Sequence, residues 1–122
     1  MVMSNILRAG LALAFLAHIE SSWSADVTMS DLLKWKARAE QNAAERARLK
    51  SYLDGLNEGI GWTYAIALRD GKATLYCQPA NLPLSGEVLG SMAVNARARY
   101  PSDATVANVI LRELQTAFPC KS

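Results

Sequence analysis

The fold of this chain is decided by the segment that begins with Leu75-Tyr76-Cys77-Gln78-Pro79 and ends with Ala117-Phe118-Pro119-Cys120. It contains the only two cysteines of the sequence. Two amphipathic stretches lie between them, separated by Tyr100-Pro101-Ser102-Asp103. A bond between Cys77 and Cys120 would tie the end of the chain to its middle and hold both stretches in one helical hairpin. In the chain-entropy model, closing a loop of about 44 residues stabilises a fold by roughly 4 kcal/mol.

Residues 1–24 have the features of an export signal. Arg8 supplies a positive charge, residues 11–19 form a short apolar core, and Ser22 and Ser24 are small residues at the positions that a signal peptidase recognises. We therefore expect cleavage before Ala25 and a periplasmic location. Because the apolar run is shorter than the roughly 20 residues that span a bilayer, we expect no membrane attachment after cleavage. An uncleaved N-terminal helix is the alternative.

The remaining residues, 25–122, are enough for one domain with a modest core. Their basic and acidic residues are interspersed and leave the net charge at +2, which does not indicate a nucleic-acid partner. An exported chain with two cysteines is expected to hold them as a disulfide, because a zinc site needs four ligands. We therefore predict a Cys77–Cys120 bond, and neither a metal site nor a cofactor.

The segment from residue 29 to about residue 67 has the composition and periodicity of α-helix. Thr28 and Asp31 have the spacing of a capping box, with Asp in place of the usual Glu. Between residues 38 and 48, however, alanine is the only apolar residue type. The pattern is therefore compatible with one long helix or with two helices that meet near Gln41-Asn42.

Gly55 and Gly59 lie one turn apart on one face of this predicted helix. Each glycine costs a helix interior roughly 1 kcal/mol relative to alanine, so we expect close contact with another helix at this point. The alternative ends the helix at Gly59 and forms a short β-hairpin over residues 62–77, with a turn at Asp70-Gly71. If the helix continues instead, Gly71 is expected to end it in a left-handed conformation.

The C-terminal region predicts two more helices. One runs from about Ser85 to Arg99, and the other follows a cap at Ser102 or Asp103. A proline separates them, because the residue before proline avoids the helical conformation. The sequence therefore predicts an all-α fold, a small disulfide-closed bundle of about four helices, with the β-hairpin at 62–77 as the alternative to a continuous helix.

The chain lacks the residues of common catalytic sites. Its only histidine, His18, lies in the expected signal peptide, so the mature chain has neither a Ser-His-Asp nor a Cys-His arrangement. Asp54 and Glu58 stand four residues apart and could serve acid–base chemistry, but we interpret them as part of a solvated face. Trp35, Trp62 and Tyr76 could each anchor a partner, but we expect them in the core. We therefore expect a protein that is not an enzyme.

Three motifs in this order resemble the resistance-associated (Rap/Tai) immunity family of type VI secretion systems: Tyr52-Leu53-x-Gly55-x-x-x-Gly59, Leu75-Tyr76-Cys77-x-Pro79 and Ala117-Phe118-Pro119-Cys120. The resemblance covers about residue 29 onward. It implies a small, all-helical periplasmic protein that binds and blocks a cognate peptidoglycan amidase effector, and that often forms homodimers. For this chain it implies the Cys77–Cys120 disulfide and the close contact at Gly55 and Gly59.

The sequence also departs from that family. Many members carry a second cysteine pair, at places where this chain has Trp35 or Lys36, and Leu49. Because the domain also occurs in proteins without a known effector, we keep a hypothesis from a second class, a small periplasmic acid chaperone of the HdeA type. Without histidine, such a chaperone would respond through carboxylates alone, below about pH 5. For this reason we favour the immunity hypothesis.

The turn Arg69-Asp70-Gly71-Lys72 is the most charged short loop of the mature chain. A loop held at both ends by rigid elements can enter a concave active site at little ordering cost. We therefore predict Arg69, Asp70 and Lys72 as the residues that contact an amidase, with an ordinary solvated turn as the alternative.

Overall fold

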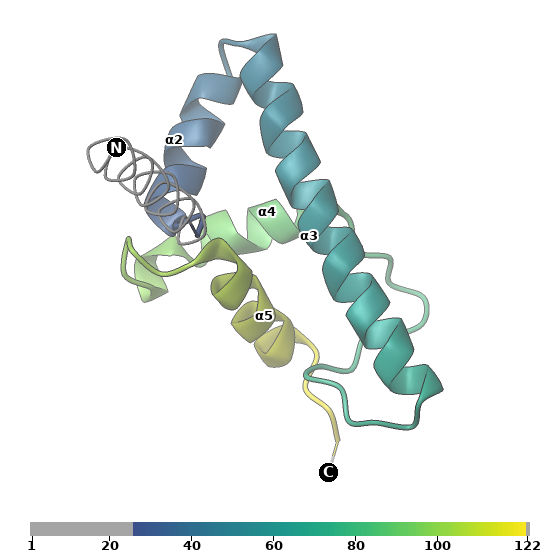
Figure 1. Ribbon diagram of the computed structural model, residues 1–122. Helices are drawn as coiled ribbons and strands as arrows, with labels where there is room; N and C mark the ends of the chain where they lie inside the picture. Colours follow the sequence, from purple (N-terminus) through teal and green to yellow (C-terminus); the bar gives the residue numbers. More distant parts are fainter. Residues whose placement is uncertain (1–25, 122) are drawn as a thin grey trace, which may run out of the picture.

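The computed structural model describes residues 26–121, so the predicted signal peptide lies outside the described residues. Within them, the chain forms four α-helices and one short 3₁₀ helix (Figure 1). These are α2 (Met29–Ala39), α3 (Ala43–Arg69), α4 (Gly86–Asn95), η1 (Arg97–Arg99) and α5 (Val106–Ala117). The all-α, disulfide-closed bundle predicted from the sequence is confirmed.

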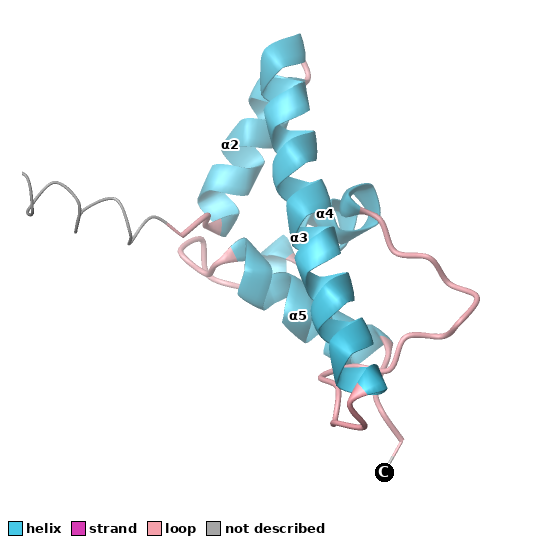
Figure 2. Cartoon of the chain, turned by 45° about the vertical axis from the view of Figure 1, so that its right-hand side comes forward, coloured by secondary structure: helices cyan, strands magenta, loops and turns pink. Residues whose placement is uncertain are grey.

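The β-hairpin alternative over residues 62–77 is wrong. Residues 62–69 continue α3, and residues 72–85 form a loop that extends to one side of the molecule (Figure 2). Leu56, Ile60 and Tyr64 recur at helical spacing and pack against the core as a continuation of the α3 stripe. The helical period therefore prevails over the alternating pattern in this segment.

The segment over residues 29–67, predicted as either one long helix or two, forms two helices. α2 ends at Ala39, and Asn42 caps α3 by accepting hydrogen bonds from the backbone of Ala44 (2.9 Å) and Glu45 (3.2 Å). The two helices then fold back on each other (Figure 1). Because few apolar side chains are available near this turn, the contact relies on Trp35, which meets Tyr52 edge-on at 5.5 Å between ring centroids.

The start of α2 is tied to the start of α5. The predicted capping box is present: the Thr28 hydroxyl accepts from the Asp31 backbone N–H, and the Asp31 carboxylate accepts from the Thr28 N–H. Backbone hydrogen bonds from Met29 to Ala104 (2.8 Å) and from Val106 to Val27 (2.9 Å) join the two segments. The first described residues are therefore held against α5.

The core lies where α4 packs between α3 and α5. The largest of its fully buried side chains are Met29, Leu32, Leu89, Val106, Val109, Ile110 and Leu114.

The prediction of a close helix contact at Gly55 and Gly59 is wrong within this chain, because a Cβ added at either position would meet nothing within 4 Å. The close approach is made instead by Gly86 and Gly90 of α4. A Cβ at Gly86 would lie 2.7 Å from backbone atoms of α3, and one at Gly90 would lie 2.7 Å from the Leu53 side chain.

Candidate functional site at the disulfide end

The predicted contact turn closes α3 with a complete C-terminal cap. Gly71 has a φ of 65°, as expected for a left-handed residue after a helix. The Gly71 N–H donates to the Leu68 carbonyl (3.2 Å), and the Lys72 N–H donates to the Ala67 carbonyl (2.8 Å). Both bonds satisfy carbonyls that the last helical turn leaves open, so the backbone of the turn is fixed.

The charged side chains of the turn point to solvent. Arg69, Asp70 and Lys72 are all exposed. The Arg69 Nε atom donates to the Asp70 carboxylate at 3.1 Å, so these two neighbours form an exposed ion pair. A partner would therefore meet the Arg69–Asp70 ion pair, whose charges cancel, and the positive charge of Lys72.

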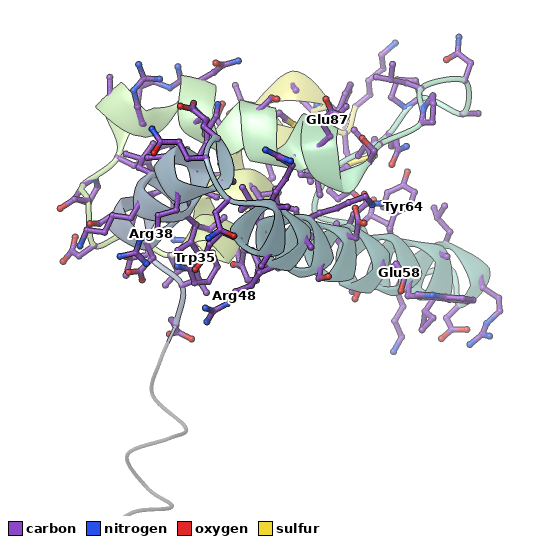
Figure 3. The ribbon with its side chains drawn as sticks, turned by 90° about the horizontal axis from the view of Figure 1, so that it is seen from above. Trp35, Arg38, Arg48, Glu58, Tyr64 and Glu87 are labelled. Atoms are coloured by element: carbon purple, nitrogen blue, oxygen red, sulfur yellow. A yellow bond between two sulfur atoms is a disulfide. The ribbon has the colours of Figure 1, made fainter. Side chains whose placement is uncertain are left out.

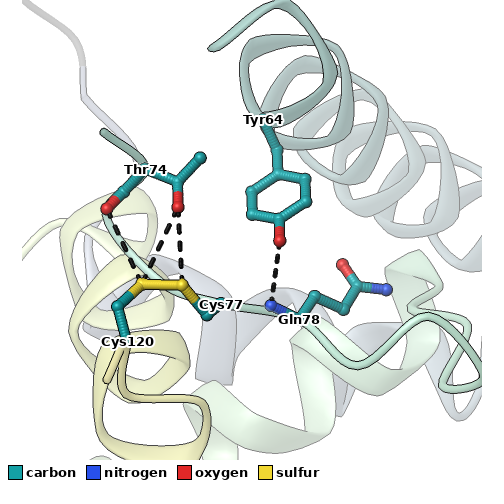
Figure 4. The surroundings of a disulfide bond; sticks show 5 residues. All are labelled: Tyr64, Thr74, Cys77, Gln78 and Cys120. Carbon is teal, nitrogen blue, oxygen red and sulfur yellow. Dashed lines mark hydrogen bonds between the residues drawn. A yellow bond between two sulfur atoms is a disulfide. The ribbon is translucent and has the colours of Figure 1, made fainter. Parts of the chain in front are cut away.

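The Cys77–Cys120 disulfide lies at the same end of the molecule and confirms the predicted pairing. The two Cα atoms are 4.9 Å apart. The Cys77 N–H donates to the Phe118 carbonyl at 2.8 Å, and the Thr74 hydroxyl lies 3.7 Å from both sulfurs (Figure 4). The turn at residues 69–72 is thus held between the end of α3 and a covalent attachment to the C-terminus.

Two stacked tyrosines join α3 to the segment beside the disulfide. The Tyr64 and Tyr76 rings are 4.9 Å apart, with an angle of 21° between their planes. The Tyr64 hydroxyl accepts a hydrogen bond from the Gln78 N–H at 3.2 Å (Figure 4). Burial, and then the neighbouring Tyr64, raise the pKa of Tyr76 above its usual value. Tyr76 therefore stays neutral. As a core side chain, it holds the segment beside the disulfide against α3.

A groove of about 430 Å³ lies between the second half of α3, residues 73–76 and α5. It exists because α3 and α5 both pack on α4 and hardly touch each other. Its apolar walls are formed by Leu56 and Ile60 of α3, Leu75 of the loop and Leu111 of α5. Gly55 and Gly59 line the same groove and leave it open, since they carry no side chain. The groove was not predicted from the sequence. The signal for it is the apolar stripe of α3, which continues past Leu53, the buried residue of that helix.

The other side of this part of α3 carries an exposed tryptophan. Trp62 is 68% exposed, so the expectation that it lies in the core is wrong. Asp54 pairs with Lys50 one turn away on the surface, and Glu58 is exposed, as expected for a solvated face. Figure 3 shows Arg48 lying beside the Trp35 ring at the far end of α3, where its guanidinium is 5.4 Å from the ring centroid.

Residues 26–121 contain no cluster of three or more histidine, cysteine or acidic side chains that could hold a metal ion. In the same part of the chain no helix is both long and apolar enough to cross a membrane. The disulfide is of a kind that persists in oxidising compartments.

The surface that the structure brings together is therefore the disulfide end of the molecule: the capped turn at residues 69–72, the tyrosine-backed loop at residues 73–78, and the apolar groove beside them. Comparison with known proteins identifies no relative, because no family model, no curated protein and no solved structure matches this chain.

Proposed function

We propose that this protein is a periplasmic immunity protein that binds a type VI secretion peptidoglycan amidase and blocks its active site. The observation that carries the proposal is the rigidly held turn at residues 69–72. Its backbone is fixed by the cap at Gly71 on one side and by the Cys77–Cys120 disulfide on the other. A protruding segment that is ordered before binding loses little conformational entropy on entering a cleft.

The chemistry of the chain supports an inhibitor rather than an enzyme. The single histidine of the sequence is His18, in the predicted signal peptide. The turn itself carries side chains suited to recognition: Lys72 can pair with an acidic rim, and Arg69 can exchange Asp70 for a carboxylate of the partner. The amidase is proposed as the partner because the sequence motifs resemble those of the Rap/Tai family.

The test is a titration of the mature protein against the type VI secretion peptidoglycan amidases encoded in the same genome. Replacing Arg69, Asp70 and Lys72 together with alanine is expected to weaken binding at least about tenfold, or roughly 1.4 kcal/mol. The control is Arg38→Ala with Glu40→Ala, which removes two exposed charged side chains at the end of α2, away from the turn. Equal affinity of the triple variant and the control would show that the turn is not the contact surface. Absence of binding by the wild-type protein would refute the proposed function.

One observation favours the acid-chaperone alternative. The carboxylates of Asp31 and Glu113 both have a lowered pKa, Asp31 because it accepts hydrogen bonds from Thr28 and Glu113 because it accepts one from Arg99. Acid would protonate both and weaken the start of α2 and the contact between α5 and the segment at Arg99 and Tyr100. A chaperone of this class should suppress aggregation of a client at pH 3 and not at pH 7. Lack of suppression at both pH values eliminates this alternative.

A further inference from the structure

We infer that the groove between α3 and α5 binds a long-chain fatty acid, with its hydrocarbon chain along α3 and its carboxylate at the end formed by residues 72–74. This inference concerns the groove beside the charged turn, shares only Lys72 with that turn, and does not depend on the proposed amidase inhibition. It rests on the dimensions of the groove, on the state of its polar groups and on the charges at one end.

The dimensions of the groove favour a thin ligand. Its volume of about 430 Å³ lies within the range of small-molecule sites. The α3 residues that line it run from Gly55 to Ala67, a rise of about 18 Å at 1.5 Å per residue. An apolar groove of this length and volume suits a single hydrocarbon chain laid along α3.

Three of the four side-chain hydroxyls that line the groove, those of Thr63, Tyr64 and Thr74, have partners within the chain. The Thr63 hydroxyl donates to the Gly59 carbonyl at 2.8 Å. The Tyr64 hydroxyl accepts from the Gln78 backbone, and the Thr74 hydroxyl contacts the disulfide sulfurs. Apart from these and the Tyr76 hydroxyl, the side chains that line the groove are apolar. The groove therefore provides mainly apolar contacts, which favour binding of a hydrocarbon chain.

The charges of the protein are unequal at the two ends of the groove. Lys72 precedes the lining residue Ala73, and Lys121 follows Cys120, whose sulfur lies 3.7 Å from the Thr74 hydroxyl. Neither lysine forms a salt bridge within residues 26–121. At the opposite end the nearest lysine, Lys50, is paired with Asp54. The end at residues 72–74 therefore attracts an anion, and the carboxylate of a fatty acid complements it.

Calorimetric titration of the mature protein with monomeric myristate tests this inference. Gly59→Leu places a side chain in the groove, whereas Gly61→Leu places the same side chain next to Trp62, outside the groove. Neither position has an atom within 4 Å of an added Cβ, and leucine favours helix over glycine, so both variants are expected to fold. We expect Gly59→Leu to weaken myristate binding at least about tenfold, and Gly61→Leu to leave the Kd within about twofold of the wild-type value.

A second pair of titrations tests the position of the carboxylate. Lys72→Glu with Lys121→Glu is expected to weaken binding of myristate and to leave binding of myristyl alcohol unchanged. The inference is overturned if the wild-type protein does not bind myristate, if both leucine variants lose binding equally, or if the protein binds anionic vesicles but not the monomeric acid. It is also overturned if light scattering shows a wild-type dimer that Gly59→Leu dissociates, because a second copy would then occupy the groove.

Discussion

Single residues decide where this fold tolerates a side chain, and its helical glycines show this most clearly. At Gly86 an added Cβ would lie 2.7 Å from backbone atoms of Leu53 and Asp54, which cannot move aside. At Gly59 the same atom would meet nothing within 4 Å. The same substitution should therefore have opposite effects on stability at the two positions.

Gly86→Ala is expected to destabilise the protein by about 1–3 kcal/mol, the usual cost of overpacking. Gly59→Ala is expected to stabilise it by up to about 1 kcal/mol, because alanine is the better helix former. Urea unfolding of both variants and the wild-type protein measures the two free energies. Destabilisation by Gly59→Ala would show that this position is packed after all.

The carboxylates of Asp31 and Glu113 are expected to make the stability of the fold depend on pH. The pKa of Asp31 is lowered by hydrogen bonds from Thr28, and the pKa of Glu113 is lowered first by its hydrogen bond from Arg99. A lowered folded-state pKa means that each contribution is present above the unfolded-state pKa, near 4, and is lost as pH falls through the folded-state value.

The free energy of unfolding should therefore fall from about pH 5 towards pH 2. The variant Asp31→Asn with Glu113→Gln should show a smaller fall, while Glu58→Gln, at an exposed position of α3, should follow the wild-type curve. Urea unfolding at a series of pH values measures this. An unchanged slope in the double variant would assign the acid sensitivity to other groups.

At the scale of elements, boundaries marked by a specific side chain could be predicted and those set by packing could not. Thr28 with Asp31, and Asp70-Gly71, signalled the start of α2 and the end of α3 because capping needs these residue types. α5 begins with Thr105 as its cap rather than Ser102 or Asp103, because the backbone bridge to Thr28 fixes the start there. The break at Asn42 was left open, since good helix formers surround it on both sides.

Asn42→Ala is expected to destabilise the fold by about 1 kcal/mol, because the Asn42 side chain satisfies two backbone donors of α3. Asn57→Ala, in the interior of the same helix, serves as the control. Chemical denaturation measures both variants. Equal effects of the two substitutions would mean that the cap contributes nothing to stability.

At the scale of the whole molecule, the fold class and the disulfide followed from the sequence, whereas the groove did not. Helical periodicity and two cysteines are local properties of the chain. The groove depends on how far α3 and α5 diverge beyond α4, and this is a property of packing. The four-residue spacing of glycines occurs twice, at Gly55 and Gly59 and again at Gly86 and Gly90, and spacing alone does not tell which pair faces a helix.

Replacing Cys77 and Cys120 together with serine should lower the free energy of unfolding by up to roughly 4 kcal/mol, because the open chain gains the entropy of a long loop. Denaturant titration of the double variant, and of the wild-type protein with and without reductant, measures this. A change below about 1 kcal/mol would mean that the unfolded chain is already compact without the bond.

The same bond also determines how the molecule would respond to a stretching force applied at its two ends. Tension would travel along α2 and α3 as far as Cys77, cross the sulfurs and leave at Cys120. The 43 peptide steps between the two cysteines, which include α4 and α5, would carry no load. An oxidised molecule pulled to full extension should therefore be shorter than a reduced one by roughly 150 Å, at about 3.3–3.6 Å per residue.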